Sequence, residues 1–171
     1  LSTLQKELQK TETALQQSAI ALTQKRYAVK LEMEEIVSQK LGYLGMPNAQ
    51  FVVDIAHSNH FLPTGCDVVN FLFSANKNGT PQPIAQTASG GELSRVMLVI
   101  KSLMVSRANL PTIIFDEIDT GVSGEIAHRM GEIMQLIAHT MQVITITHLP
   151  QIAAKGVAHY KVYKYDTENA T

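Results

Sequence analysis

The chain has 171 residues, of which 45% are hydrophobic and 17% charged, and it contains no tryptophan. This composition is typical of a globular domain with a core, or of a small domain with an appendage. The formal net charge of −1 excludes a general electrostatic attraction to nucleic acid, so any DNA contact must be local. The single cysteine, Cys66, excludes an internal disulfide, and no metal-ligand cluster surrounds it in the sequence.

The sequence shows no sign of a secretory signal or a membrane span. Residues 1–10 are mostly polar, which excludes a secretory signal, and no apolar run reaches the length that spans a bilayer. The chain begins with Leu1 inside a repeating pattern. We therefore interpret the sequence as a fragment of a longer protein.

Residues 1–41 contain neither proline nor glycine and are rich in Gln, Glu, Lys and Leu. Apolar residues recur every seventh position, as in the seam of a coiled coil, although Thr11, Ser18 and Lys25 interrupt the second seam position. These residues predict a coiled-coil arm segment over 1–41, which ends near Gly42. The alternative is one long amphipathic helix packed on a globular core. The seven-residue repeat comprises Leu1, Leu8, Leu15, Leu22, Val29 and Ile36.

The remaining residues, 42–171, predict a globular α/β lobe. Segments 51–56 and 67–75 have the apolar composition of strands, while Pro81 and Pro83 favour an irregular stretch. A helix begins after Ser89, with an apolar face formed by Leu93, Val96, Met97, Ile100 and Met104.

Further along, strands are predicted over 112–115, 143–147 and 159–165, with a helix over about 124–139. A strand, a helix and a strand with short connections indicate a parallel pair crossed over by a helix. The second half is therefore predicted to be α/β, with isolated His57 and His60 in loops.

The tetrapeptide Ser89-Gly90-Gly91-Glu92 opens the helix after the irregular stretch. A serine followed three residues later by glutamate is a capping box, which is one interpretation. Two consecutive glycines are not needed for capping, but they let a ligand approach the backbone N–H groups. A helix start of this kind binds phosphate, which is the other interpretation.

Two acidic residues, Asp116 and Glu117, follow the apolar strand at 112–115, and His148 follows the strand at 143–147. Carboxyl ends of parallel strands lie at one edge, where α/β sheets bind ligands. Asp116 is suited to hold Mg²⁺, and Glu117 to polarise water as a general base. The alternatives are a surface turn with two acids and a structural histidine.

Together these motifs resemble those of the ATP-binding-cassette (ABC) ATPases: residues 89–92 the signature motif, 113–117 Walker B, 119–124 the D-loop and His148 the switch histidine. Longer stretches at 71–76, 88–98, 115–124 and 147–154 are similar to the RecN family of SMC-like proteins in bacterial DNA repair. The resemblance covers nearly the whole chain. It implies that 42–171 form the C-terminal lobe of an ABC ATPase head, preceded by the coiled-coil arm at 1–41.

The resemblance also implies ATP and Mg²⁺ as cofactors, with Asp116 as the metal ligand, Glu117 as the base and His148 at the γ-phosphate. Ser123 stands where many members of the superfamily have a D-loop aspartate, which puts the usual D-loop contact in doubt. The signature residues, implied to reach the ATP held by a partner head, are Ser89, Gly90, Gly91 and Glu92.

The sequence lacks a glycine-rich loop ending in Gly-Lys-Ser/Thr, the Walker A phosphate cradle. The family carries this loop in an N-terminal lobe, so this chain alone is predicted to be inactive. Implied partners are that lobe, a second copy of the head and DNA, in the cytoplasm at the nucleoid and without a membrane, for double-strand-break repair and recombination. Two alternatives stay open: the head of another SMC-like chromosome-maintenance ATPase, and a catalytically inactive coiled-coil dimerisation module.

Overall fold

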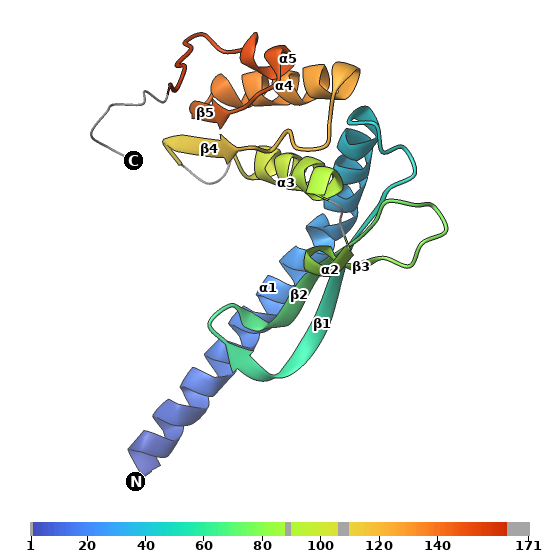
Figure 1. The fold of residues 1–171 in the computed structure, drawn as a ribbon. Helices are drawn as coiled ribbons and strands as arrows, with labels where there is room; N and C mark the ends of the chain where they lie inside the picture. The colour runs from blue at the N-terminus through green and yellow to red at the C-terminus, as the bar shows by residue number, and fades with distance from the viewer. Residues whose placement is uncertain (1, 88–89, 106–109, 164–171) are drawn as a thin grey trace, which may run out of the picture. The chain divides into compact units, whose positions relative to one another are not determined.

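The structure is a computed structural model that describes residues 2–87, 90–105 and 110–163 (Figure 1). The chain forms two compact units, Leu1–Ile100 and Lys101–Thr171, and the division falls within helix α3 (Gly90–Met104). The structure contains α-helices together with one antiparallel sheet and one parallel pair of strands, which confirms the predicted α/β class. Among the described helices, none has the length and apolar character that crossing a membrane requires.

The first unit begins with a long helix, α1 (Ser2–Tyr43). Its residues 2–18 are exposed, including Leu8 and Leu15, while Ala19, Val37 and Leu41 further along are buried. The helix ends as predicted near Gly42: Gly45 takes a left-handed φ of 80°, and the Met46 N–H donates to the Leu41 carbonyl at 2.9 Å. Coiled-coil pairing by the exposed leucines remains a prediction.

A hairpin of β1 (Gln50–Leu62) and β2 (Gly65–Ser74) follows, with a short β3 (Gln82–Pro83) at its edge and the helix α2 (Ile84–Thr87) after it. The strand predicted at 51–56 is longer than expected, and the loop assignment of His57 and His60 was wrong. Both lie in β1, where His57 pairs in register with Asp67 of β2. The polar sequence of 57–60 lacks the apolar alternation that indicates a strand, and the pairing with β2 is irregular between His57 and Leu62.

One buried carboxylate anchors α1 to the hairpin. The Asp67 side chain is almost fully buried, and its Oδ2 accepts hydrogen bonds from Thr23 Oγ1 at 2.7 Å and Arg26 Nη1 at 2.8 Å. Arg26 also donates to the Thr64 carbonyl at 2.7 Å. The Thr23 hydroxyl, followed by the Arg26 guanidinium, lowers the pKa of Asp67 from its ordinary value. The second half of α1 therefore packs on the hairpin through a compensated charge.

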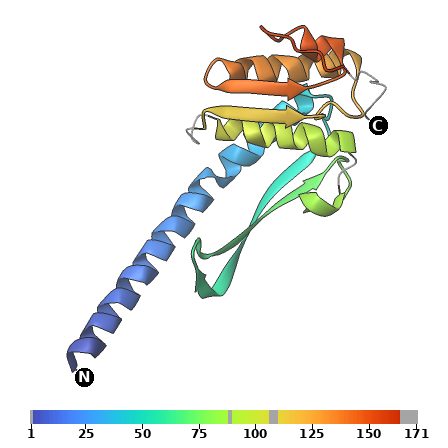
Figure 2. The same ribbon diagram turned by 60° about the vertical axis from the view of Figure 1, so that its left-hand side comes forward.

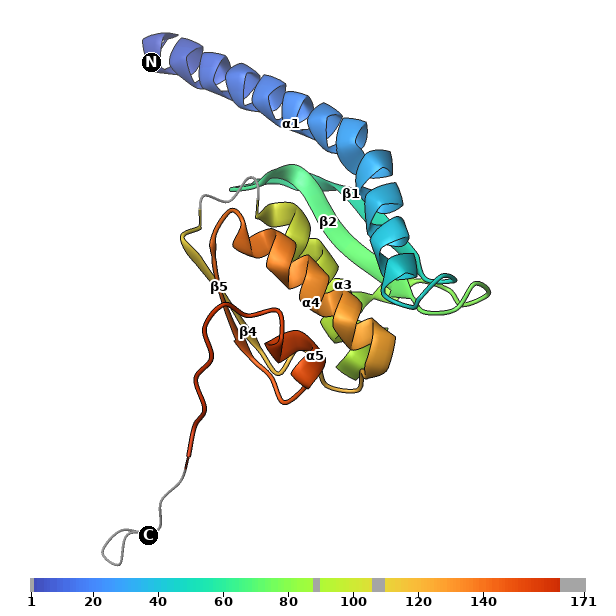
Figure 3. The ribbon, with the colours of Figure 1, turned by 90° about the horizontal axis from the view of Figure 1, so that it is seen from above.

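The second unit is built on the parallel pair β4 (Thr112–Asp116) and β5 (Gln142–Ile146), whose arrows point the same way in Figure 2. Helix α4 (Gly124–Ala138) makes the crossover, as predicted, and buries one face that includes Met130, Ile133 and Ile137. A short helix, α5 (Pro150–Ala153), lies beside α4 (Figure 3). The predicted helix at 124–139 and strand at 143–147 are confirmed to within one residue.

The strand predicted at 159–165 is wrong for the residues that can be assessed. Residues 159–163 have no regular secondary structure, and 164–165 lie outside the described residues. Val157, Tyr160 and Val162 are almost fully exposed. In the described part of this unit the sheet consists of β4 and β5, and an extended segment without a neighbouring strand has no partner for its backbone hydrogen bonds.

Candidate nucleotide site

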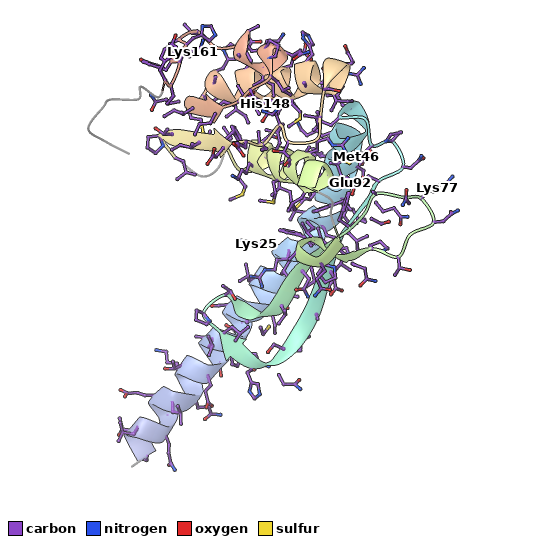
Figure 4. All side chains as sticks on the ribbon, viewed as in Figure 1. Lys25, Met46, Lys77, Glu92, His148 and Lys161 are labelled. Carbon is purple, nitrogen blue, oxygen red and sulfur yellow. The ribbon has the colours of Figure 1, made fainter. Side chains whose placement is uncertain are left out.

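The carboxyl edge of the parallel pair brings three predicted residues to one region. Asp116 ends β4 and stands in register with Ile146, the last residue of β5. Glu117 directly follows Asp116, and His148 lies two residues beyond Ile146, in the second unit (Figure 4). All three side chains are exposed. Exposed carboxylates with room for water suit Mg²⁺, which keeps part of its hydration shell.

The backbone at Glu117 is unusual. Its φ of 46° makes it the one described residue other than glycine with a positive φ, and this left-handed conformation costs roughly 1–2 kcal/mol in a residue with a Cβ. Hydrogen bonds hold it on both sides. Its N–H donates to the Ile146 carbonyl at 3.1 Å, and its carbonyl accepts from the N–H of Thr120 at 3.2 Å. Strain retained at a strand end points to a functional position.

Next to this turn lies Asp119, which sequence reasoning left without a role. Its side chain is fully buried at 0% exposure, and its Oδ2 accepts a hydrogen bond from Thr147 Oγ1. The same oxygen is 3.7 Å from Nδ1 of His148. The only sequence signal was its position within the D-loop-like stretch, and neither Thr147 nor the burial of Asp119 was predicted.

Ser123, the predicted D-loop residue, is the N-cap of α4. It is exposed, its backbone is extended, and its hydroxyl makes no capping hydrogen bond in the described structure. The first turn of α4 therefore starts without the side-chain cap that serine often supplies. Ser123 belongs to the second unit with Asp116, Glu117 and His148.

The signature-like residues belong to the first unit. Ser89 lies outside the described residues, whereas Gly90, Gly91 and Glu92 form the start of α3, where Figure 4 labels Glu92. A Cβ placed on Gly90 would meet no atom within 4 Å, so the described structure leaves this helix start open to a ligand. The predicted apolar face of α3 needs one correction: Met104 is exposed, and the buried set is Val96, Leu98, Val99 and Ile100.

Arg95 fixes the start of α3 within the first unit. Its Nε donates to the Gly91 carbonyl at 3.0 Å, and its Nη1 donates to the Leu44 carbonyl at 3.1 Å. The second bond joins the first turn of α3 to the loop that follows α1. The glycine-containing turn therefore has a fixed position relative to α1.

A second cluster of side chains, in the first unit, surrounds Cys66. No ligand cluster around Cys66 was predicted, but the pairing of His57 with Asp67 brings ligand atoms of His57, Cys66 and Asp67 within 4.8 Å of one another. Arg26 already neutralises Asp67 at 2.8 Å, and a cation would have to share that carboxylate with a guanidinium. We therefore interpret the cluster as the structural anchor of α1.

Comparison with known proteins gives a consistent result. No protein-family model matches the chain. It is 37% identical over 158 residues to the DNA repair protein RecN of Haemophilus influenzae, 41% over 150 residues to that of Rickettsia bellii, and 40% over 171 residues to that of Rickettsia conorii. These alignments cover 92%, 88% and 96% of the chain. The chain spans 28%, 27% and 31% of those relatives' lengths.

Solved structures share the fold at low identity. A Smc head domain with a coiled coil and joint from Pyrococcus yayanosii has a TM-score of 0.59 at 14% identity, covering 91% of this chain and 30% of that one. An SmcHead bound to the C-winged helix domain of ScpA has a TM-score of 0.56 at 16% identity, covering 75% and 38%. These similarities confirm the predicted head fold.

Proposed function

Since the chain belongs by sequence to the RecN family of DNA repair proteins, we propose that it is the C-terminal part of an ATPase head that binds and hydrolyses ATP. In this proposal residues 1–41 belong to the coiled-coil arm and residues 42–171 to the head lobe. The full-length protein acts on DNA in the cytoplasm, at the bacterial nucleoid, in double-strand-break repair and recombination. ATP is sandwiched between this head and a second copy.

The observation that carries the proposal is the register of β4 and β5. Because Asp116 pairs with Ile146, the acid pair at 116–117 and His148 emerge from neighbouring parallel strands at the same edge. This is the edge at which α/β sheets bind ligands. The left-handed backbone at Glu117 is a second, independent sign of function there.

Each residue has a role in the proposed site. Asp116 is the Mg²⁺ ligand, and Glu117 is the general base that polarises the attacking water. His148 contacts the γ-phosphate. The open helix start at Gly90, with Ser89, Gly91 and Glu92, faces the ATP of the partner head, and Ser123 is the nucleotide-site residue of the D-loop. Mg²⁺ held by Asp116 would supply the positive charge that neutralises the negative charge developing on the phosphate.

The sequence of this chain contains no Walker A loop. In the proposal that loop belongs to the N-terminal lobe of the same protein, so these 171 residues hold half of each composite site. Too few donors remain to neutralise a triphosphate, and the chain alone should bind Mg-ATP very weakly and hydrolyse none. Micromolar binding measured by calorimetry on residues 1–171 would place a phosphate site elsewhere.

Two other functions are alternatives to the proposed one. The head of another SMC-like chromosome-maintenance ATPase would have the same fold, but its solved representatives are 14–17% identical, against 35–41% for the RecN proteins. A dimerisation module without catalysis would have no need for two acids at a strained strand end. ATP turnover by the full-length protein separates the module from the ATPase.

Substitution of the two acids in the full-length protein tests the roles directly. Glu117→Gln preserves side-chain size but removes the base, so turnover should fall by roughly 10²-fold or more while ATP binding survives. Because hydrolysis is blocked, this variant should accumulate as an ATP-bound dimer. Asp116→Asn removes the metal ligand, so its dimer should form poorly with Mg-ATP.

Sizing chromatography of both variants with and without Mg-ATP provides the comparison, and wild-type protein without nucleotide is the control. Wild-type turnover by Glu117→Gln would show that Glu117 is not the base. Equal dimerisation of the two variants would contradict the separate roles given to Asp116 and Glu117.

A further inference from the structure

Asp119 is a buried carboxylate whose charge is incompletely compensated. Its Oδ2 has one hydrogen bond, from Thr147, and its Oδ1 is buried without a hydrogen-bond partner among the described residues. An under-satisfied buried carboxylate is costly, and such groups usually have a role beyond packing. A titratable side chain lies beside it: Nδ1 of His148, whose side chain is 70% exposed, is 3.7 Å from Oδ2 of Asp119.

The Thr147 hydroxyl has a defined orientation. The Leu149 N–H donates to Thr147 Oγ1 at 3.0 Å, so the hydroxyl hydrogen is directed to Asp119. The carboxylate is thereby tied to Thr147 on one side of His148, and the Thr147 oxygen in turn accepts from the Leu149 N–H on the other side. The loop that carries the imidazole is held against Asp119 while the ring itself remains exposed.

The gap between Asp119 and His148 is small. The 3.7 Å from Oδ2 to Nδ1 is too long for a hydrogen bond, which needs about 2.7–3.2 Å. A modest rotation of an exposed ring closes that difference. An ionised carboxylate can only accept a hydrogen bond, so a bond with Nδ1 would fix the imidazole proton on Nδ1 and leave Nε2 facing away from Asp119.

We propose that Asp119 is a positioning residue for His148: it holds the proton of the neutral imidazole on Nδ1 and presents Nε2 to the phosphate-binding region. The role at phosphate rests on the proposed function, whereas the tautomer itself does not. Asp119 touches neither ATP nor the reacting water in this scheme. A purely structural Asp119 would instead hold the turn after β4 and leave the tautomer of His148 unchanged.

Two-bond ¹H–¹⁵N correlation spectra of the 171-residue chain, recorded at about pH 8.5 where an ordinary imidazole is neutral, test this directly. His148 should be mainly the Nδ1–H tautomer, in contrast to the Nε2–H form that exposed histidines favour. The internal reference is His159, whose Nε2 lies 2.7 Å from the Ala153 carbonyl and must donate to it. His159 should therefore be the Nε2–H form in every sample.

In Asp119→Ala no acceptor remains beside Nδ1, so His148 should switch to the Nε2–H tautomer while His159 does not change. If wild-type His148 is already the Nε2–H form, the proposal is wrong. It is equally wrong if the substitution leaves the tautomer unchanged. The wild-type spectrum decides the matter even if Asp119→Ala fails to fold.

In the full-length protein, Asp119→Ala should lower kcat roughly tenfold or more, the usual effect of losing a partner that orients a functional imidazole, with a smaller change in KM for ATP. An unchanged kcat beside a switched tautomer would show that Asp119 orients His148 but that His148 does not serve turnover. Absence of ATP hydrolysis by the wild-type protein would contradict the proposed function and leave the tautomer result standing.

Discussion

Asp67 in the first unit and Asp119 in the second are both buried carboxylates, exposed by 4% and 0%, but their surroundings differ. Asp67 accepts hydrogen bonds from Thr23 and Arg26, and His57 lies 3.9 Å from its other oxygen. Asp119 has one hydrogen bond and one oxygen without a described partner. The first charge is compensated within the fold, and the second is left available beside an exposed imidazole.

The difference separates two uses of a buried charge. A carboxylate paired with a guanidinium and a hydroxyl fixes one element on another, here α1 on the hairpin. A carboxylate with spare hydrogen-bonding capacity, next to a strained backbone at Glu117, is suited to orient a group that must meet a ligand. The first unit thus uses its buried charge to hold α1, and the second unit carries the residues of the proposed chemistry.

The largest effect on stability is expected from Asp67→Asn in the 171-residue chain. The substitution leaves the mostly buried Arg26 guanidinium without its anion, and a buried charge that loses its partner is strongly destabilising. Urea unfolding followed by circular dichroism measures the loss. Asp54→Asn, at an exposed position of the same hairpin, is the matched control and should be nearly neutral. Equal stability of the two variants would contradict the anchor.

A pH titration of stability should show the same anchor with a smaller effect. Because the pKa of Asp67 is lowered from 3.8 on folding, its contribution is fully present above about pH 4. The contribution is lost as the pH falls through the lower pKa of the folded state. The free energy of unfolding of Asp67→Asn should therefore fall less steeply below pH 4 than that of the wild type. Parallel curves for the two proteins would show that Asp67 titrates alike in both states.

The smallest effect concerns the strain at Glu117. Glycine adopts a φ of 46° without a Cβ clash, but it also gains freedom in the unfolded chain. Glu117→Gly should therefore be more stable than Glu117→Gln by roughly 0.5–1 kcal/mol. Both variants lack the carboxylate charge, but only glutamine keeps a Cβ and with it the backbone strain. Thermal unfolding of the two variants measures the difference. A less stable glycine variant would show that the backbone there is not strained.

Much of the fold was predictable because apolar periodicity reports burial. The helix at 124–139 and the strands at 112–115 and 143–147 were found from it, and the order of Asp116, Glu117 and His148 along these elements placed them at one edge. The signal failed at His57 and His60, which lie in β1 where the sequence is polar and the pairing with β2 is irregular after His57. It failed also at 159–163, where an apolar segment has no neighbouring strand among the described residues.

The buried carboxylates were beyond reach for a different reason. Asp67 and Asp119 look like ordinary polar positions in the sequence, because their roles depend on residues that lie far along the chain. Thr23 and Arg26 reach Asp67 across more than forty positions, and Thr147 reaches Asp119 across 28. Periodicity carries no information about such pairs, so the partners became visible only in the folded chain.

The most direct test of this division of roles compares Asp67→Asn with Asp119→Ala in the full-length protein, measuring urea unfolding and ATP turnover per folded molecule for each. The account predicts that Asp67→Asn lowers stability and leaves turnover close to that of the wild type. It predicts that Asp119→Ala costs less stability and lowers turnover roughly tenfold or more. If Asp119→Ala unfolds as readily as Asp67→Asn while its folded molecules turn over ATP at the wild-type rate, both carboxylates are structural and the account is contradicted.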